Sequence, residues 1–544
     1  MIHFVSILLK QSRTPPMLDH EPIFGKNVIE TLSEGMYDNP LFLFREYVQN
    51  SADSIDSAVR SGILREGEGQ IEIVIDAETC LITFEDNGTG IPHDAVKAML
   101  ANIGNSQKDR RTDKGFRGIG RLGGLGYCQK VRFETSAQGE TIRSVLEWDA
   151  RNLHEILANK DEKIHAGQLI KRITSTWEEK YGSDEHFFKV SLINVNKSSD
   201  ELLDIDEVRK YLSMVTPVPF DYAKFPFIQK IEKFMTDEKL PALHEYRLNL
   251  NGDEVRKGYE TPLTIGDGKP IEILDVECRT VRADGLIIGW YWFCVSKFEG
   301  VLPKKCWQRN IRLRKINIQV GEADCLSNHP KRGDTLWRED RGNNYFIGEI
   351  HALDVDLIPN SRRDYFNQDE ACRRFEVALR NEFYNLHDLY HHASTIRSAY
   401  SAVRVASHLQ VEFDKKDKQG DFYDKMSRDK ERHKVESARE KAQAAKRTIE
   451  KIGSKVTILQ ARETCDDIGA LPVATVLKSY QNEMTEKNRA FKPKIHPQRG
   501  YAKDGIKKSV KDVLDEVFGV LNKILPEEQA APIREAITKR FTSK

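Results

Sequence analysis

Residues 41–56 read Leu41-Phe-Leu-Phe-Arg-Glu46-Tyr-Val-Gln-Asn50-Ser-Ala-Asp53-Ser-Ile-Asp56, and this stretch decides the fold expected for the first part of the chain. Pro40 lies just ahead of it, and the pattern predicts a helix. At roughly 100° per residue, Glu46, Asn50 and Asp53 fall within about 60° of one another on one face. Burying two carboxylates and a carboxamide without partners is costly. We therefore expect this stripe to face a ligand or water, while apolar residues bury the other faces.

A β-hairpin is expected next. Residues 71–84 alternate between apolar and polar side chains, with turn-forming residues at 76–79. The hairpin delivers the sequence Asp86-Asn-Gly88-Thr-Gly90 to a strand end. The carboxylate of Asp86 can accept the exocyclic amine of a purine, and the two glycines allow the backbone to approach the ring closely.

A glycine-rich stretch follows about fifteen residues later. Residues 103–126 read Ile103-Gly-Asn-Ser-Gln-Lys-Asp-Arg-Arg-Thr-Asp-Lys-Gly-Phe-Arg-Gly-Ile-Gly-Arg-Leu-Gly-Gly-Leu-Gly126. Several of the residues between the glycines are basic. A glycine-rich backbone before a helix can aim successive N–H groups at phosphate oxygens, and it also permits hinge motion. The stretch is typical of a phosphate-binding lid.

Taken one at a time, these three features have ordinary explanations. The Asp-x-Gly-x-Gly motif alone is typical of a surface turn, the acidic stripe of a solvated helix face, and the glycines of a flexible loop. Their order along the chain, from helix to strand end to glycine loop, is what indicates a nucleotide site.

In that order the three elements resemble the N-box, G1 box and G2 box of the GHKL superfamily, which includes gyrase B, HtpG-type chaperones, histidine kinases and MutL. The resemblance implies a Bergerat-type α/β sandwich that binds ATP with Mg²⁺. The chain has no Gly-x-x-x-x-Gly-Lys-Ser/Thr motif, so a P-loop fold is not expected. Histidine kinases use no carboxylate base at the position of Glu46, so this residue favours an ATP hydrolase.

The resemblance implies a role for each candidate residue. Glu46 would be the general base that activates the attacking water, and Asn50 would hold Mg²⁺ at the phosphates. Asp53 would support the adenine and ribose region, and Asp86 would bind the adenine amine. The remaining candidates would shape the pocket or contact the phosphates: Gly88, Gly90, Lys108, Gly118, Gly120, Gly123 and Gly124.

The chain departs from the family pattern at one place. The family supplies a threonine after a glycine on a later strand, whereas the comparable segment here reads His186-Phe-Phe-Lys-Val-Ser191-Leu-Ile-Asn-Val. Ser191 or a water molecule is the candidate substitute. Adenine recognition is therefore less firmly implied than the phosphate chemistry.

The second part of the chain is rich in strand patterns, at 286–295, 311–320 and 345–357, and closes with an apolar-periodic helix around 375–389. Within it, Asp356-Leu-Ile-Pro-Asn-Ser-Arg362-Arg363-Asp364 resembles the middle-domain loop of HtpG-type chaperones. In that family the loop arginine reaches the γ-phosphate when the clamp shuts, which by match is Arg363, with Arg362 as its rival. The alternative is a pair of solvated arginines. Residues 309–314 resemble the same domain more weakly.

The third part changes character from about residue 405 to long charged helices. Apolar residues step by three and four along a short heptad seam, which fits either a two-helix hairpin within one chain or an intermolecular coiled coil. The seam residues are Val435, Ala438, Ala442, Ala445, Ile449, Ile452 and Val456. Residues 482–504 resemble a linker, and 510–524 form one helical face until Pro526.

We therefore expect an α+β protein with four regions. These are an ATP-binding domain (22–200), an α/β middle domain of the HtpG or transducer kind with a catalytic arginine loop (201–400), a charged helical or coiled-coil region (405–481), and C-terminal helices (505–544).

Composition adds few constraints. Lysine plus arginine equals aspartate plus glutamate, at 84 each, so net charge makes no case for nucleic-acid binding. The eight cysteines lack a metal-ligand spacing and suggest a reducing cytoplasm. No apolar run reaches membrane-spanning length, so no membrane association is expected.

Three functional interpretations remain open. The first is a chaperone-like clamp that closes on a protein client when ATP binds. The resemblance to the family implies that this clamp is a homodimer. The second is a clamp of the MORC or MutL kind that engages nucleic acid through local basic runs such as 304–315 and 441–447. The third is a nucleotide switch in a bacterial stress or antiphage defence pathway.

Overall fold

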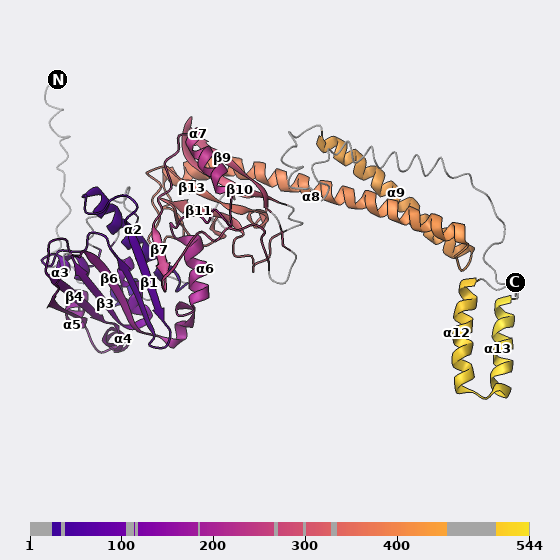
Figure 1. The fold of residues 1–544 in the computed structure, drawn as a ribbon, viewed down its shortest axis with the longest axis horizontal. Coiled ribbons are helices and arrows are strands. Elements are labelled where there is room, and N and C mark those ends of the chain that lie inside the picture. Colours follow the sequence, from indigo (N-terminus) through magenta and orange to yellow (C-terminus); the bar gives the residue numbers. More distant parts are fainter. Residues whose placement is uncertain are drawn as a thin grey trace, which may run out of the picture.

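The computed structural model describes residues 24–33, 39–104, 114, 118–182, 185–265, 270–271, 273–296, 301–327, 335–453 and 508–542. These residues form two β-sheets with their helices, then a long helical hairpin and a terminal helix pair (Figure 1). The expected α+β fold is confirmed. No described helix combines the length and the apolar character needed to cross a bilayer.

The first sheet has eight strands and continues beyond the boundary expected near residue 200. Its spatial order is β5 (Thr174–Lys180), β4 (Ile142–Asp149), β3 (Cys128–Ser136), β6 (Phe187–Val195), β2 (Leu81–Asp86), β1 (Gln70–Asp76), β7 (Arg247–Leu250) and β8 (Asp253–Glu254). All neighbours are antiparallel except β1 and β7, which pair in parallel. The edge of the first unit is thus built from a segment that returns after residue 245.

Helices cover one face of this sheet. Alternate strand residues such as Ile73, Phe84, Phe133 and Leu192 share a single core with the apolar residues of these helices. The opposite face is polar and carries pairs such as Arg132 with Glu147. The helices are α1 (Asn27–Ser33), α2 (Phe42–Arg60), α3 (Val96–Ala101), η1 (Gly120–Gly126), α4 (Ala150–Ala158), α5 (Ala166–Ile173), η2 (Lys197–Leu202) and α6 (Ile205–Val215). This is the expected two-layer α/β sandwich.

The hairpin predicted over residues 71–84 is present as β1 and β2. Ile71, Ile73 and Ile75 all point into the core. Asp76 closes the turn, since its Oδ1 accepts the amides of Glu78 and Thr79 at 3.0 and 3.1 Å. The register places Asp86 at the end of β2, opposite Ile71 at the beginning of β1.

The second sheet is buried on both faces. Its order is β12 (Ile318–Gln319), β11 (Asn310–Lys315), β13 (Ile347–Ala352), β10 (Leu286–Ser296) and β9 (Ile273–Ala283). Tyr291 and Phe293 join a core with α8 (Glu370–Gln419), whereas Trp290 and Trp292 join one with α7 (Ile228–Asp237). Two short 3-10 helices, η3 (Cys325–Ser327) and η4 (Gly342–Tyr345), lie between β12 and β13.

Two expectations for this unit need correction. The segment 311–320 is a tight hairpin of β11 and β12, because Ile316 and Asn317 adopt positive φ angles of 50° and 57° and turn the chain. The helix expected over 375–389 is α8, which continues to Gln419 because its later residues pack against another helix instead of the sheet.

That other helix is α9 (Lys425–Gly453), which folds back along α8 (Figure 1). Gly420 ends α8 in a left-handed conformation, with a φ of 68°. Ala438 and Ala442 of the predicted seam pack against Val403 and Ala406 of α8. The seam therefore serves a hairpin within one chain; Val456 and the linker 482–504 lie outside the described residues.

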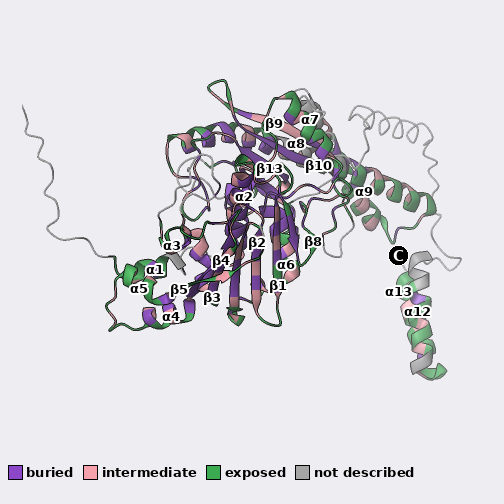
Figure 2. Cartoon of the chain, turned by 60° about the vertical axis from the view of Figure 1, so that its left-hand side comes forward, coloured by how far each residue is buried: buried purple, intermediate pink, exposed green. Residues whose placement is uncertain are grey.

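The terminal pair consists of α12 (Lys508–Ile524) and α13 (Glu527–Thr542). The helix predicted over 510–524 is confirmed, with Pro526 in the turn that follows. Leu514 and Phe518 of α12 contact Ile537 of α13. Figure 2 shows buried residues concentrated in the two sheets, whereas α9, α12 and α13 are mostly exposed.

Candidate functional site

The predicted acidic stripe lies on α2, which packs on the covered face of the first sheet. Phe44 and Tyr47 contact Phe84 of β2, with ring centroids 5.3 and 4.7 Å apart. The stripe itself is more enclosed than expected: Glu46 and Asp53 are 6% and 3% exposed. Residues of the glycine-rich stretch cover it, so the stripe faces the predicted lid instead of open solvent.

The carboxylate of Glu46 is held by backbone and by one cation. A Cβ built on Gly120 would lie only 2.6 Å from Glu46 Oε2, so a side chain at that position would push the carboxylate aside. Arg45 Nη2 lies 3.5 Å from Oε1 and its guanidinium sits 4.3 Å above the Phe42 ring. Among the described residues no donor hydrogen-bonds to Oε1. Burying an unsatisfied carboxylate oxygen is costly, and water or substrate at this position would satisfy it.

Asp53 is tied directly to the glycine-rich stretch through Lys114. The backbone amide of Lys114 donates to Asp53 Oδ1 at 2.9 Å, and its Nζ donates to Asp56 Oδ2 at 2.5 Å. Tyr246 donates its hydroxyl to Asp56 Oδ1 at 2.5 Å, and burial together with this bond raises the pKa of Tyr246. Sequence reasoning did not single out Lys114, because it is one of several basic residues in the stretch. No local signal links Tyr246 to the site.

Asp86 ends β2 and is 2% exposed. Its Oδ1 accepts the amide of Gly88 at 3.0 Å, which folds the following loop back over the strand end. A side chain on Gly88 would collide with Ser54 of α2, and one on Gly90 would collide with the carbonyl of Ser136. Gly90 also has a φ of 64°. Both glycines are therefore needed to press the loop between α2 and β3.

The structure removes Ser191 as the substitute for the family threonine. Ser191 pairs with Thr83, while Asp86 pairs with Phe188. Because alternate residues of a strand point to opposite faces, Ser191 lies on the face opposite to Asp86. Thr135 of β3 pairs with Phe188 and so brings its hydroxyl to the face of Asp86. That hydroxyl accepts the amide of Ile91 at 2.8 Å and donates to the carbonyl of Phe187 at 2.8 Å.

The glycines of the lid fall into two groups. Gly118, with a φ of 67°, lies just before η1, and Gly120 begins that helix beside Glu46. Gly123 and Gly124 are buried, and a Cβ on Gly124 would lie 2.6 Å from Leu192 and 2.7 Å from the hydroxyl of Tyr47. The later glycines therefore seat η1 on the domain core. Lys108 lies outside the described residues.

Arg363 reaches from the second unit to the lid of the first. Its Nη1 donates to the carbonyl of Lys114 at 2.6 Å, and the residue is buried, whereas Arg362 is exposed. Arg363 adopts a positive φ of 52°, and its carbonyl accepts the amide of Gly321 at 2.7 Å, which anchors the loop on the second unit. A bond from Asn39 Nδ2 to Glu322 Oε1 at 3.1 Å joins the two units nearby. The arrangement connects the second unit to Asp53 through one lid residue.

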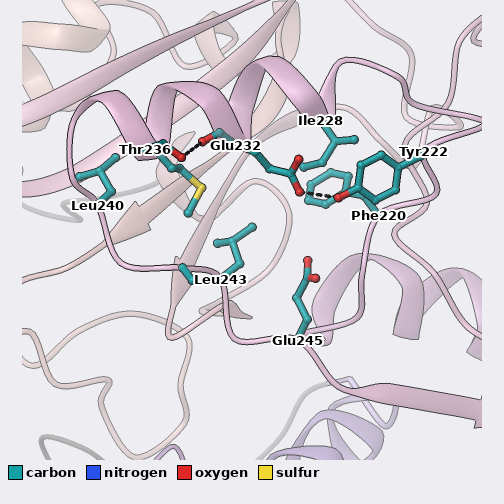
Figure 3. A pocket seen from close by; sticks show the side chains of 10 residues that line it. Phe220, Tyr222, Ile228, Glu232, Thr236, Leu240, Leu243 and Glu245 are labelled. Atoms are coloured by element: carbon teal, nitrogen blue, oxygen red, sulfur yellow. Dashed lines mark hydrogen bonds between the residues drawn. The ribbon is translucent and has the colours of Figure 1, made fainter. Parts of the chain in front are cut away.

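A separate cavity of about 320 Å³ lies beside α7 (Figure 3). Burial raises the pKa of Glu245 in its wall to about 7, and Tyr222 donates a hydrogen bond to Glu232. The lining residues are Phe220, Tyr222, Ile228, Glu232, Met235, Thr236, Leu240, Ala242, Leu243 and Glu245. None of them is a predicted nucleotide residue, so this cavity is distinct from the candidate site.

Comparison with known proteins supports the assignment of the first unit. Residues 43–177 match the family described as "Histidine kinase-, DNA gyrase B-, and HSP90-like ATPase". The "Chaperone protein HtpG" of Shewanella loihica is 25% identical over 196 residues, which cover 32% of this chain and 30% of that protein. That of Shewanella baltica is 26% identical over 178 residues (29% and 28%), and that of Shewanella oneidensis 28% over 144 residues (23% and 22%). The matched part thus spans less than a third of these relatives.

Proposed function

We propose that this chain, whose residues 43–177 form a nucleotide-binding domain of the GHKL superfamily close to the HtpG type, is a Mg²⁺-dependent ATP hydrolase that works as a nucleotide-gated clamp. The observation that carries the proposal is the contact of Arg363, from the second unit, with Lys114 at the lid. Lys114 in turn donates its amide to Asp53 of α2. In this proposal the ATP-binding unit, expected over 22–200, also takes in β7 and β8.

The proposed chemistry rests on positioning. Phosphoryl transfer needs orientation and charge neutralisation more than covalent catalysis. Glu46 would accept a proton from the attacking water, which is supported by its buried carboxylate and its oxygen without a donor among the described residues. Asp86 would accept the adenine amine, supported by its place at a strand end beneath a loop of two glycines. Arg45 would hold the Glu46 carboxylate in place.

Asn50 is the proposed ligand of Mg²⁺. It is partly buried on α2 between Glu46 and Asp53, and a carboxamide oxygen is a suitable ligand for a hard cation. Bound Mg²⁺ would neutralise charge on the phosphates. Asn50 would then orient the phosphate end of the nucleotide toward Glu46.

Arg363 would couple clamp closure to hydrolysis. Its guanidinium already bonds to the lid backbone, so a small shift of the second unit would change what the arginine contacts. Such arginines stabilise charge in the transition state of phosphoryl transfer. Reopening after hydrolysis would then release the products, as domain and lid steps often do.

We further infer a homodimer that acts on a protein client, because the aligned relatives carry the name chaperone. Nucleic acid is the less favoured partner. Arg312, Arg314 and Lys315 of the candidate basic run are buried, and all three bond to protein acceptors. They are therefore not available to phosphates.

The test is ATP hydrolysis by the full chain and by Glu46→Ala. We expect ATP binding, measured by calorimetry, to persist in Glu46→Ala while phosphate release falls by about 10²- to 10⁴-fold, the usual contribution of a general base. Glu66→Ala, an exposed acid beyond α2, is the matched control and should leave both unchanged. Unchanged turnover in Glu46→Ala would refute the role of Glu46. Light scattering with a non-hydrolysable ATP analogue tests dimer closure in the same preparations.

A further inference from the structure

Two histidines lie one helical turn apart at the point where α8 leaves the core of the second unit. Leu386 of α8 belongs to that core, His387 follows it directly, and His391 lies one turn further along the helix. The segment before η4 brings Glu339 beside them. One ligand atom from each of these three residues lies within 4.8 Å of the other two.

We propose that His387, His391 and Glu339 form a binding site for a divalent transition-metal ion, with zinc as the expected ion. Two neutral imidazoles and one carboxylate are a recognised zinc ligand set, with the fourth position left to water. The proposal concerns a site separate from the nucleotide pocket.

The observed spacing is close to that of a tetrahedral site. With bonds of about 2.0–2.1 Å, neighbouring ligand atoms of tetrahedral zinc are about 3.3–3.5 Å apart. His391 Nε2 lies 3.3 Å from Glu339 Oε1, so this edge already has the required length. The His387 and His391 rings are 4.3 Å apart between centroids and inclined by 68°. A side-chain shift of roughly 1–1.5 Å would bring His387 to bonding distance.

A neighbouring contact orients the Glu339 carboxylate at this site. Residues four apart on a helix share a face, so α8 presents both imidazoles together. Glu339 Oε2 accepts from Arg341 Nε at 2.8 Å, which orients the carboxylate and leaves Oε1 toward His391. Asp388, between the histidines, is engaged elsewhere, since its Oδ1 accepts from Arg338 at 2.9 Å.

The ordinary alternative is a His–Glu ion pair. Such pairs exist on the same hairpin: His408 with Glu412 at 3.8 Å, and His433 with Glu436 at 3.9 Å. Both are exposed and involve two groups only. The proposed site differs by its third ligand and by the burial of His387, which is 5% exposed.

A metal at this place would fix the base of the α8–α9 hairpin. The segment that carries Glu339 also carries Trp337, which stacks on Phe383 of α8 at 4.3 Å between ring centroids. Beyond His391 the helix packs against α9. The metal would therefore join this turn of α8 to the segment that carries Glu339 and set the direction in which the hairpin projects (Figure 1).

The test uses the full chain, first stripped with a chelator and then dialysed against ZnCl₂ or CoCl₂. We expect one zinc per chain and a cobalt spectrum of tetrahedral intensity. Because His387 is buried, the variants are His391→Ala and Glu339→Gln, at partly exposed positions. Each should weaken zinc binding by at least about tenfold, since loss even of outer-shell partners costs 10–100-fold. His408→Ala, from the paired control on the same helix, should bind as the unchanged chain does.

A second readout separates binding from folding damage. Zinc should raise the unfolding temperature of the unchanged chain and of His408→Ala, because a ligand of the folded state stabilises it. The same addition should leave His391→Ala and Glu339→Gln unshifted, while their circular dichroism matches that of the unchanged chain. Undiminished zinc binding by these two variants, or no bound zinc in any preparation, would overturn the site.

Discussion

The carboxylates of Glu349 in the second sheet and of Glu46 in α2 are both buried, but they are surrounded differently. Glu349 Oε1 lies 2.6 Å from Arg314 and 3.5 Å from Lys257, and it accepts the hydroxyl of Tyr259 at 3.0 Å. Burial acts to raise the pKa of Glu349, but the charges of Arg314 and Lys257 outweigh it and hold that pKa well below its usual value. The Oε1 atom of Glu349 thus has three fixed partners, while its Oε2 lies 3.3 Å from His351 Nε2 without a hydrogen bond.

The Glu46 carboxylate has one cation, Arg45, at 3.5 Å. Another close neighbour is Gly120, which has no side chain to offer as a partner. Gly120, Gly88 and Gly90 give this pocket close walls of backbone, whereas the Glu349 cluster is filled with side chains. A buried carboxylate held by two cations and a hydroxyl stabilises the fold, whereas one held by a single cation at 3.5 Å is available for chemistry.

The largest effect should come from Arg363, through which the second unit touches Lys114 at the proposed nucleotide pocket. We expect Arg363→Ala to lower the rate of ATP hydrolysis by about 10³-fold, or roughly 4 kcal/mol in activation free energy, as for other arginines that complete a phosphoryl-transfer site. Exposed Arg362 is the control, and Arg362→Ala should keep full turnover. The assay is steady-state phosphate release. If Arg363→Ala lost stability but kept its turnover, Arg363 would belong with the structural cluster.

The next effect should be on stability, at Glu349. Glu349→Gln removes the negative charge but leaves Arg314 and Lys257 buried, so the free energy of unfolding should fall by about 3–5 kcal/mol. Denaturation in urea measures it, because Trp290 stacks on His351 of the same cluster at 4.4 Å and reports its loss by fluorescence. The control is Glu85→Gln, whose 3.0 Å pair with Lys189 is partly exposed, so its loss should cost at most about 1 kcal/mol. If both variants lost the same free energy of unfolding, Glu349 would not be a structural carboxylate of the kind described here.

The residues proposed for the nucleotide site could be selected from the sequence, whereas those of the Glu349 cluster could not. Glu46, Asn50 and Asp53 share one helix, and Asp86, Gly88 and Gly90 share one loop, so periodicity and spacing reveal them. The cluster around Glu349 brings together residues from separate elements, among them Lys257 and His351. In the sequence, each of these residues resembles a solvent-exposed residue of a strand. They are in fact buried, because other elements cover both faces of the sheet. That covering depends on the tertiary fold and cannot be seen in the sequence of one strand.

The remaining differences between the predictions and the structure arise from contacts between residues that are far apart in the sequence. Ser191 was a candidate because it lies in the family's strand, but only the pairing with Thr83 reveals which face it occupies. Lys114 and Tyr246 meet at Asp56 from far apart in the chain. The domain boundary predicted near residue 200 excluded β7, because the local sequence of a parallel edge strand does not show which strand it pairs with. Arg363 was a candidate because its loop resembles a family motif, and in the structure its side chain contacts Lys114.

Asp86 gives a smaller, purely ligand-directed test. Asp86→Asn keeps an oxygen to accept the amide of Gly88 but replaces the other acceptor with a donor, which would face the adenine amine. ATP affinity, measured by calorimetry, should fall by about 10- to 100-fold, since hydrogen bonds to charged groups contribute roughly 1.5–3 kcal/mol. The free energy of unfolding should change little. Asp76→Asn makes the same change at the turn of the same hairpin and should bind ATP normally.

The smallest effect should come from an exposed pair near the same pocket, His93 with Glu140 at 3.0 Å. The bond from Glu140 raises the pKa of His93, so the stabilisation from His93 is complete below pH 6.5 and is lost as pH rises through its folded pKa. For Glu140, burial acts to raise the pKa, but bonds from His93 and Ala137 outweigh it and lower that pKa. The contribution of Glu140 is therefore present above pH 4.5 and is lost as pH falls through its lowered value.

The unfolding temperature of His93→Gln should accordingly fall furthest below that of the unchanged chain between pH 4.5 and 6.5, and the two should converge at higher pH. His433→Gln, in the exposed pair on α9, is the control and should track the unchanged chain at every pH. ATP affinity should not follow the same pH curve, because His93 lies beyond the glycines that shape the loop of Asp86. If affinity did follow that curve, this surface pair would be part of the pocket, and the number of charged partners would no longer distinguish the functional carboxylates from the structural ones.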